Sequence, residues 1–167
     1  REAGNAKLIG VVKGNGYGLG LAELAGRLVD GGVHMLAVSE LSDALKLRCY
    51  GIPAEIMLLT PLYDPTDLKD ALLSRVTLCI DTKAEAAAAE RMARSLDVGG
   101  NVQLCIDTGF GRYGLPWDDP QKVWETARSL ERLRLTGTYS HLSRGAEESG
   151  EESLRQYRRL TGLCEQL

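Results

Sequence analysis

The sequence predicts an α/β fold built from repeated βα units, and three features of the chain support this prediction. Short apolar runs typical of strands alternate with segments of helical apolar spacing along the 167 residues. Glycine-rich or capping signals separate these segments, and no low-complexity linker interrupts them. The length suits one compact layered domain with a sizeable core.

The first βα unit is the clearest. A continuous apolar run over Lys7–Val12 is typical of a parallel strand that is covered on both faces. Helical spacing follows over Leu19–Val29, and Gly31-Gly32 is a typical helix end. Five further strands are expected over Met35–Ser39, Ile56–Leu59, Val76–Ile80, Asn101–Ile106 and Arg134–Ser140.

Capping residues mark the starts of several helices. Asp64 can cap a helix that begins with Pro65, and Asp119 precedes Pro120 in the same way before a helix that runs to about Leu130. Thr82-Lys83-Ala84-Glu85 reads as a capping box in front of an alanine-rich helix that runs to about Leu96. Other helices are expected over Leu41–Tyr50 and after Ser149, the latter with an apolar set of Leu154, Tyr157, Leu160 and Leu163.

Composition excludes several classes of function. A net charge of −3 gives no electrostatic reason to expect nucleic acid or an anionic membrane as partner. No apolar stretch has the length of a spanning helix and no signal-peptide pattern opens the chain, so a cytoplasmic location is expected. The four cysteines are widely spaced without a C-x-x-C pair, so we expect reduced thiols, with no metal site and no disulfide framework.

Lys13 ends the first apolar run and stands before alternating glycines at 14, 16, 18 and 20. In βα-repeat proteins the carboxyl ends of the strands carry the chemistry, so Lys13 is the first candidate functional residue, although most strand-end lysines only extend into solvent. A dinucleotide site is the rival interpretation, with Glu40 as the ribose ligand. Its G-x-G-x-x-G spacing fails, because the third glycine is replaced by Leu19, Leu21 or Glu23.

Three stretches in order resemble the alanine racemase family. They are Lys13-x-Asn15-x-Tyr17-Gly18-x-Gly20, the run Ile106-Asp107-Thr108-Gly109-Phe110-Gly111-Arg112-Tyr113-Gly114, and Gly137-Thr138-Tyr139-Ser140-His141. The resemblance spans about residues 6 to 145. Six βα units would suit an open doubly wound sheet or part of an eight-stranded barrel.

The resemblance favours the barrel. It implies an α/β fold of the (β/α)8 TIM type, incomplete at about six strands, in which residues 1–167 are the N-terminal part of a pyridoxal-phosphate-binding domain. The C-terminal β domain of the family is absent from this chain.

The resemblance also implies roles for individual residues. Lys13 would form the Schiff base with pyridoxal 5'-phosphate and act as acid and base on one face of the substrate. Tyr17 would reach the cofactor phosphate, and Arg112 would contact the substrate carboxylate and the side of the cofactor that carries the phenolic oxygen. His141 would lie against the cofactor ring.

The implied activity is the interconversion of L- and D-alanine through a pyridoxal-phosphate aldimine and a carbanion. Racemisation needs a second base on the opposite face, which in the family is a tyrosine from the second domain of the partner subunit of a homodimer. We therefore expect this chain alone to be weakly active or inactive. The alternatives are another barrel-type pyridoxal-phosphate enzyme, such as a decarboxylase or a racemase for another amino acid, and a non-catalytic cofactor-binding domain.

Four positions depart from the family pattern. Gly14 and Gly16 stand where alanines are usual, and Leu19 stands where a histidine is common, so a more flexible loop is expected. Cys105 stands where many members have a modified lysine that supports the arginine. With cysteine there, Arg112 needs another support.

Overall fold

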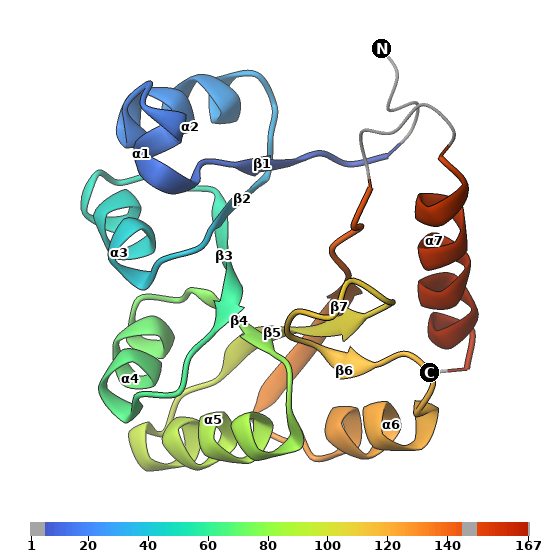
Figure 1. Ribbon diagram of the computed structural model, residues 1–167. Coiled ribbons are helices and arrows are strands. Elements are labelled where there is room, and N and C mark those ends of the chain that lie inside the picture. Colours follow the sequence, from blue (N-terminus) through green and yellow to red (C-terminus); the bar gives the residue numbers. More distant parts are fainter. Residues whose placement is uncertain (1–5, 145–149, 167) are drawn as a thin grey trace. The chain divides into compact units, whose positions relative to one another are not determined.

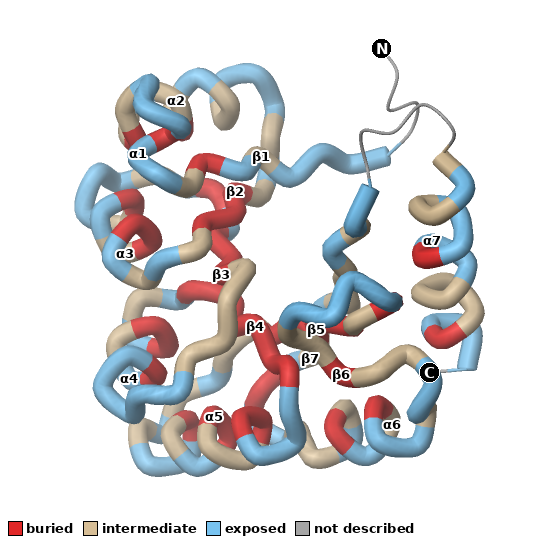
Figure 2. Tube along the Cα trace, viewed as in Figure 1, coloured by how far each residue is buried: buried red, intermediate tan, exposed pale blue. Residues whose placement is uncertain are grey.

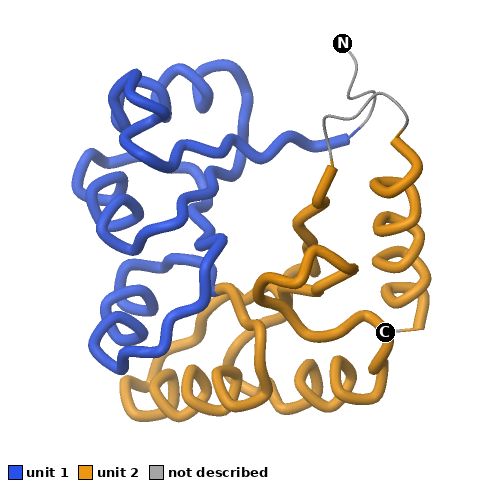
Figure 3. Tube along the Cα trace, in the orientation of Figure 1, with its two compact units in different colours: residues 1–78 blue, residues 79–167 orange. Residues whose placement is uncertain are grey.

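The computed structural model describes residues 6–144 and 150–166, in two compact units formed by residues 1–78 and 79–167 (Figures 1 and 3). In both units parallel strands alternate with helices along the chain. The predicted α/β class with repeated βα units is therefore confirmed. All six predicted strands are present, each with ends within a few residues of the prediction.

Unit 1 contains three parallel strands that pair in chain order, β1 (Ile9–Val11), β2 (Met35–Val38) and β3 (Glu55–Pro61). Leu36 of β2 lies opposite Gly10 on one side and Ile56 on the other. The helices of the unit lie along one side of these strands (Figure 1), and they are α1 (Lys13–Tyr17), α2 (Leu21–Asp30), α3 (Leu41–Cys49) and α4 (Pro65–Leu73).

The core of unit 1 is centred on β2 and β3 (Figure 2). Leu36, Leu47 and Ile56 are completely buried there. The prediction that the first strand is covered on both faces is wrong, because Ile9 is 46% exposed. A continuous apolar run indicates a strand, but its burial depends on what packs against it, which local sequence does not specify.

Unit 2 begins inside β4 (Thr77–Ile80), which crosses the boundary between the units. Its central strand is β5 (Gly100–Asp107), which pairs in parallel with β7 (Leu133–Tyr139). A short strand that the sequence did not predict, β6 (Leu115–Pro116), also pairs with β5. The helices are α5 (Lys83–Leu96), α6 (Pro120–Arg128) and α7 (Glu151–Cys164).

The predicted helix caps are confirmed. The Asp64 carboxylate accepts a hydrogen bond from the Thr66 N–H at 2.7 Å, and the Asp119 carboxylate accepts one from the Lys122 N–H at 3.1 Å. The Thr82 hydroxyl accepts from the Glu85 N–H at 3.1 Å. The Glu85 carboxylate, however, accepts from the N–H of Asp81, one residue before the cap position of an ideal capping box.

The apolar set predicted for the last helix is partly wrong. Leu163 is buried, but Leu154 and Tyr157 are more than half exposed, while Gln156 is completely buried. Gln156 and Leu163 are seven residues apart and therefore share the buried side of α7. Ser149, the expected cap, lies outside the described residues. Within residues 6–144 and 150–166, no helix is both long and apolar enough to cross a membrane.

Candidate functional site

Lys13 lies at the carboxyl end of β1, as predicted. The preceding residue, Val12, is completely buried, and its N–H donates to the Ala37 carbonyl at 2.9 Å, which continues the pairing with β2. Lys13 itself is half-buried and is the first residue of α1. The base of this side chain is therefore held by the sheet, which is the rigidity that a covalent or acid–base role requires.

The segment after Lys13 is a left-handed turn. Gly14, Asn15, Gly16 and Tyr17 have φ angles of 60°, 53°, 62° and 55°, and the Gly16 N–H donates to the Val12 carbonyl at 3.0 Å. Left-handed backbone is costly for most L-residues and free of that cost for glycine. The glycines at 14 and 16 thus suit the conformation of a defined, hydrogen-bonded turn.

Asn15 connects this turn to the next helix. Its side-chain Oδ1 accepts a hydrogen bond from the Leu21 N–H at 3.0 Å, at the first residue of α2. Tyr17 projects from the same turn and is 62% exposed, so its ring contributes little to the core. Unit 1 therefore brings Lys13 and Tyr17 together on one short turn at a strand end.

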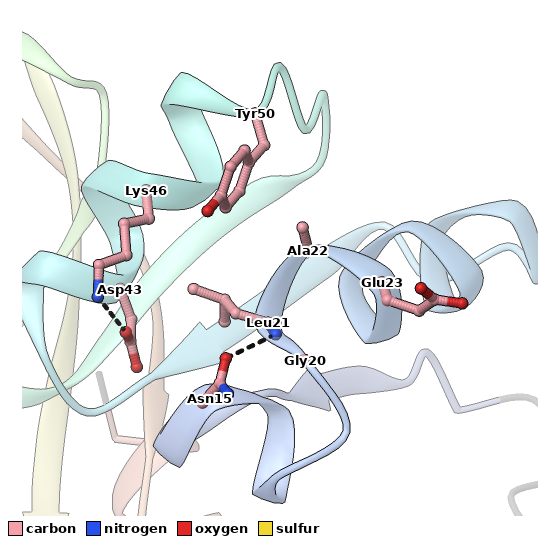
Figure 4. Close-up of a pocket in the computed structure, with 8 residues that line it drawn as sticks. All are labelled: Asn15, Gly20, Leu21, Ala22, Glu23, Asp43, Lys46 and Tyr50. Carbon is pink, nitrogen blue, oxygen red and sulfur yellow. Dashed lines mark hydrogen bonds and ion pairs between the residues drawn. The ribbon is translucent and has the colours of Figure 1, made fainter.

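A pocket of about 490 Å³ lies beside the same turn, between the start of α2 and α3 (Figure 4). Asp43 lines it with a side chain that is only 10% exposed, and its carboxylate lies 3.6 Å from the Lys46 ammonium. Neither Lys13 nor Tyr17 lines this pocket. The full lining is Asn15, Gly20, Leu21, Ala22, Glu23, Asp43, Lys46 and Tyr50.

Arg112 and His141 are brought together in unit 2 by the ring of Phe110. The Arg112 guanidinium lies 5.1 Å from the centroid of that ring, a distance typical of a cation–π contact. The His141 ring lies 5.0 Å from it, at an interplanar angle of 56°. Arg112 also lies 5.0 Å from the ring centroid of Tyr113. Two aromatic rings, those of Phe110 and Tyr113, therefore support the Arg112 guanidinium.

Cys105 and Cys79 are buried, and they form a cluster with the half-buried Tyr139. The Cys105 thiol donates to the Tyr113 carbonyl at 3.5 Å, and the Tyr139 hydroxyl donates to the Cys79 sulfur at 2.9 Å. A hydrogen bond with Cys105, together with burial, raises the pKa of the Cys79 thiol, and the same bond lowers the pKa of the Cys105 thiol. Burial also raises the pKa of Tyr139, which keeps its hydroxyl protonated as a donor.

Phe110 is the residue that sequence reasoning missed. It stands inside the second family stretch, but no role was assigned to it, because an aromatic residue in a loop gives no signal of what its ring will touch. A glycine on each side, Gly109 at φ 128° and Gly111 at φ 76°, was the available hint of a specialised turn. The four cysteines, including Cys79 and Cys105, are free thiols, as expected.

These observations define a class of protein, namely a chain of βα repeats with functional side chains at the carboxyl ends of its strands. A lysine follows the first strand, and an arginine and a histidine that follow two later strands contact one aromatic ring. The family described as "Alanine racemase, N-terminal domain" matches residues 1–167. The chain belongs to this family.

Individual relatives agree with the family match. The chain is 33% identical over 165 residues to alanine racemase 2 of Caldanaerobacter subterraneus subsp. tengcongensis, in an alignment that covers 96% of this chain and 42% of that protein. Among solved structures, alanine racemase from Clostridium difficile 630 superposes with a TM-score of 0.90 at 26% identity, over 98% of this chain and 43% of that one. The alanine racemase of Streptomyces coelicolor A3(2) gives a TM-score of 0.81 at 31% identity, over 96% and 45%. The chain thus spans less than half the length of these relatives.

Proposed function

We propose that this chain is the N-terminal, cofactor-binding part of a pyridoxal-phosphate-dependent racemase that interconverts L- and D-alanine. The observation that carries the proposal is the position of Lys13, half-buried at the end of a paired strand in a member of the alanine racemase family. The proposal includes a homodimeric, cytoplasmic enzyme, in which a second domain completes the active site.

The side chains of the chain fit the chemical groups of pyridoxal phosphate. Lys13 offers an amine for the aldehyde, and the exposed Tyr17 hydroxyl is a donor suited to a phosphate oxygen. In unit 2, His141 is exposed beside the Phe110 ring and offers a flat partner for an aromatic cofactor. When bound, pyridoxal phosphate withdraws electrons from the α-carbon of an amino acid and makes its α-hydrogen acidic.

Each residue then has a definite task. Lys13 would hold the cofactor through Nζ, and the same amine would accept or return the α-proton on one face of the substrate. Tyr17 binds the phosphate. Arg112 binds the substrate carboxylate, since a guanidinium held against two rings keeps its planar fork of donors in one orientation.

Racemisation also requires a proton donor on the opposite face, and by family resemblance that group is a tyrosine of the second domain of the partner subunit. Residues 1–167 alone are therefore expected to be weakly active or inactive. Turnover by this chain alone at the rate of the complete enzyme would contradict that part of the proposal.

The test is a racemase assay on the full-length protein reconstituted with pyridoxal phosphate, with D-alanine measured from L-alanine. Lys13→Ala should lower kcat/KM by a factor on the order of 10³ or more and remove the visible absorbance of lysine-linked cofactor. Lys122→Ala, which removes an exposed lysine from α6, is the matched control and should change neither. Retention of both signals in Lys13→Ala would refute the assignment of Lys13. Turnover of another amino acid in preference to alanine would refute the substrate.

A further inference from the structure

Asp107 makes an unusual number of contacts with the loop that carries Phe110 and Arg112. It is the last residue of β5, and its Oδ1 accepts hydrogen bonds from the N–H groups of Gly109 at 2.9 Å, Phe110 at 2.9 Å and Gly111 at 3.1 Å. Oδ2 accepts a second bond from Gly111 at 3.2 Å. One carboxylate therefore binds three successive backbone amides.

The loop needs such a contact to hold one conformation. Gly109 and Gly111 both have left-handed φ angles, and because glycine has no Cβ it can adopt many other backbone conformations as well. Thr108, by contrast, is fixed on its own account. It is fully buried, its hydroxyl shares a 2.7 Å hydrogen bond with that of Ser140, and its carbonyl accepts from Arg159 at 2.7 Å. The hydrogen bonds of the Asp107 carboxylate hold the next three residues, 109–111, in place as well.

The residue held at the centre of the turn is Phe110, whose ring contacts both Arg112 and His141. A change in the backbone of residues 109–111 would move this ring and the start of the segment that bears Arg112. The hydrogen bonds of the Asp107 carboxylate act on both side chains through this turn.

We propose that Asp107 is a positioning residue, whose carboxylate orders the turn of residues 109–111 and thereby sets the Phe110 ring against Arg112 and His141. The inference rests on the proposed function, in which Arg112 binds the substrate carboxylate. Loss of the Asp107 carboxylate should therefore weaken substrate binding more than it slows the chemical step.

Two variants of the full-length protein separate this role from simple stabilisation. Asp107→Ala removes every acceptor, whereas Asp107→Asn keeps an Oδ1 that can accept the three main bonds. Asp119→Ala is the matched control, because the Asp119 carboxylate also accepts a backbone N–H, but that of Lys122 at the start of α6 and none of residues 109–111. All three are assayed for kcat and KM with alanine, and for hydrogen exchange of the Gly109–Gly111 amides.

Asp107→Ala should raise KM by about tenfold with a smaller change in kcat, and should speed amide exchange at residues 109–111. Asp107→Asn should restore most of both, and Asp119→Ala should leave both unchanged. Faster exchange with an unchanged KM would overturn the positioning role, and unchanged exchange would overturn the structural basis.

A readout without catalysis keeps the two proposals apart. The Phe110 ring should shift the NMR signals of the His141 ring protons, because the two ring centroids are 5.0 Å apart. Asp107→Ala should move these signals toward unperturbed values and Asp119→Ala should not. If the wild-type protein shows no racemase activity, the proposed function fails on that result, and the His141 signals still decide whether Asp107 positions the ring.

Discussion

Glu90 offers a sharp test of how the start of β7 is held. This side chain of α5 is buried, and its Oε1 accepts hydrogen bonds from the N–H groups of Glu131 at 2.8 Å, Arg132 at 3.0 Å and Leu133 at 2.9 Å. The perturbations are Glu90→Ala, which leaves these donors without their acceptor, and Glu90→Gln, which keeps one acceptor oxygen of the same reach.

The magnitude follows from the burial of the donors. Glu131 and Arg132 are exposed, so their N–H groups can bind water instead, whereas Leu133 is 3% exposed and its N–H cannot. A buried donor that loses a charged acceptor costs about 1.5–3 kcal/mol, and two exposed donors add little. Glu90→Ala should therefore lower the free energy of unfolding by about 2–4 kcal/mol at pH 7, and Glu90→Gln by about 1 kcal/mol.

The effect of Glu90→Gln should depend on pH. Burial raises the pKa of Glu90, but the three N–H donors and nearby Arg94 outweigh it and hold the pKa below the ordinary value of 4.5. The folded state then binds fewer protons than the unfolded state between the two values. The stabilisation by the carboxylate is complete above about pH 4.5 and is lost as pH falls through the folded pKa.

The assay is denaturant unfolding of the full-length variants at pH 7 and at successively lower pH, with Glu152→Gln as control. Glu152 forms a helix-surface pair with Arg155, a kind of contact worth a few tenths of a kcal/mol. A loss below 1 kcal/mol for Glu90→Ala at pH 7 would refute the assignment of the donors. A difference between wild type and Glu90→Gln that stays constant at acid pH would refute the electrostatic argument.

Two further predictions concern hydrogen bonds near the proposed site. Asn15→Ala should lower the free energy of unfolding by about 1–2 kcal/mol in denaturant, because it removes the Oδ1 acceptor for the Leu21 N–H and places alanine in left-handed backbone. Asn15→Gly should lower it less, because glycine adopts this backbone without strain. Equal stability of the wild type and both variants would contradict this prediction. Tyr139→Phe should lower the free energy of unfolding by about 0.5–1.5 kcal/mol, because it removes the hydrogen bond to the Cys79 sulfur. Tyr157→Phe, at an exposed position, is the control and should leave stability unchanged. An effect of Tyr139→Phe no larger than that of the control would contradict this prediction.

The parts of the fold that sequence predicted well depend on few neighbouring residues. The caps at Asp64, Thr82 and Asp119 were predicted because a cap bonds an amide two or three positions further along the chain. The exposure of Ile9 and the burial of Gln156 were not predicted, because each depends on elements distant in sequence. Gln156, for example, accepts a hydrogen bond from the Ser143 N–H, which helix periodicity cannot reveal.

The candidate site divides in the same way. The position of Lys13 follows from a local pattern, an apolar run that ends at a lysine, and the structure bears out that placement. The contact of Phe110 with His141 joins the ends of two strands, so it required the pairing of β5 with β7 as well as the loop conformation. The Asp-x-Gly-x-Gly pattern at residues 107–111 indicates a turn, but not which side chain the turn displays.

The backbone at Tyr17 supports a role for its side chain beyond folding. Its φ of 55° is left-handed, a conformation that costs a non-glycine residue about 1–2 kcal/mol. Gly14, Gly16 and Gly18 in the same segment avoid that cost, so glycine at 17 would suit the backbone better. Burial does not offset it, since the Tyr17 ring is 62% exposed. A strained backbone that presents an exposed phenol on the same turn as a strand-end lysine is the arrangement expected of a residue that contacts a ligand, which is the task proposed for Tyr17.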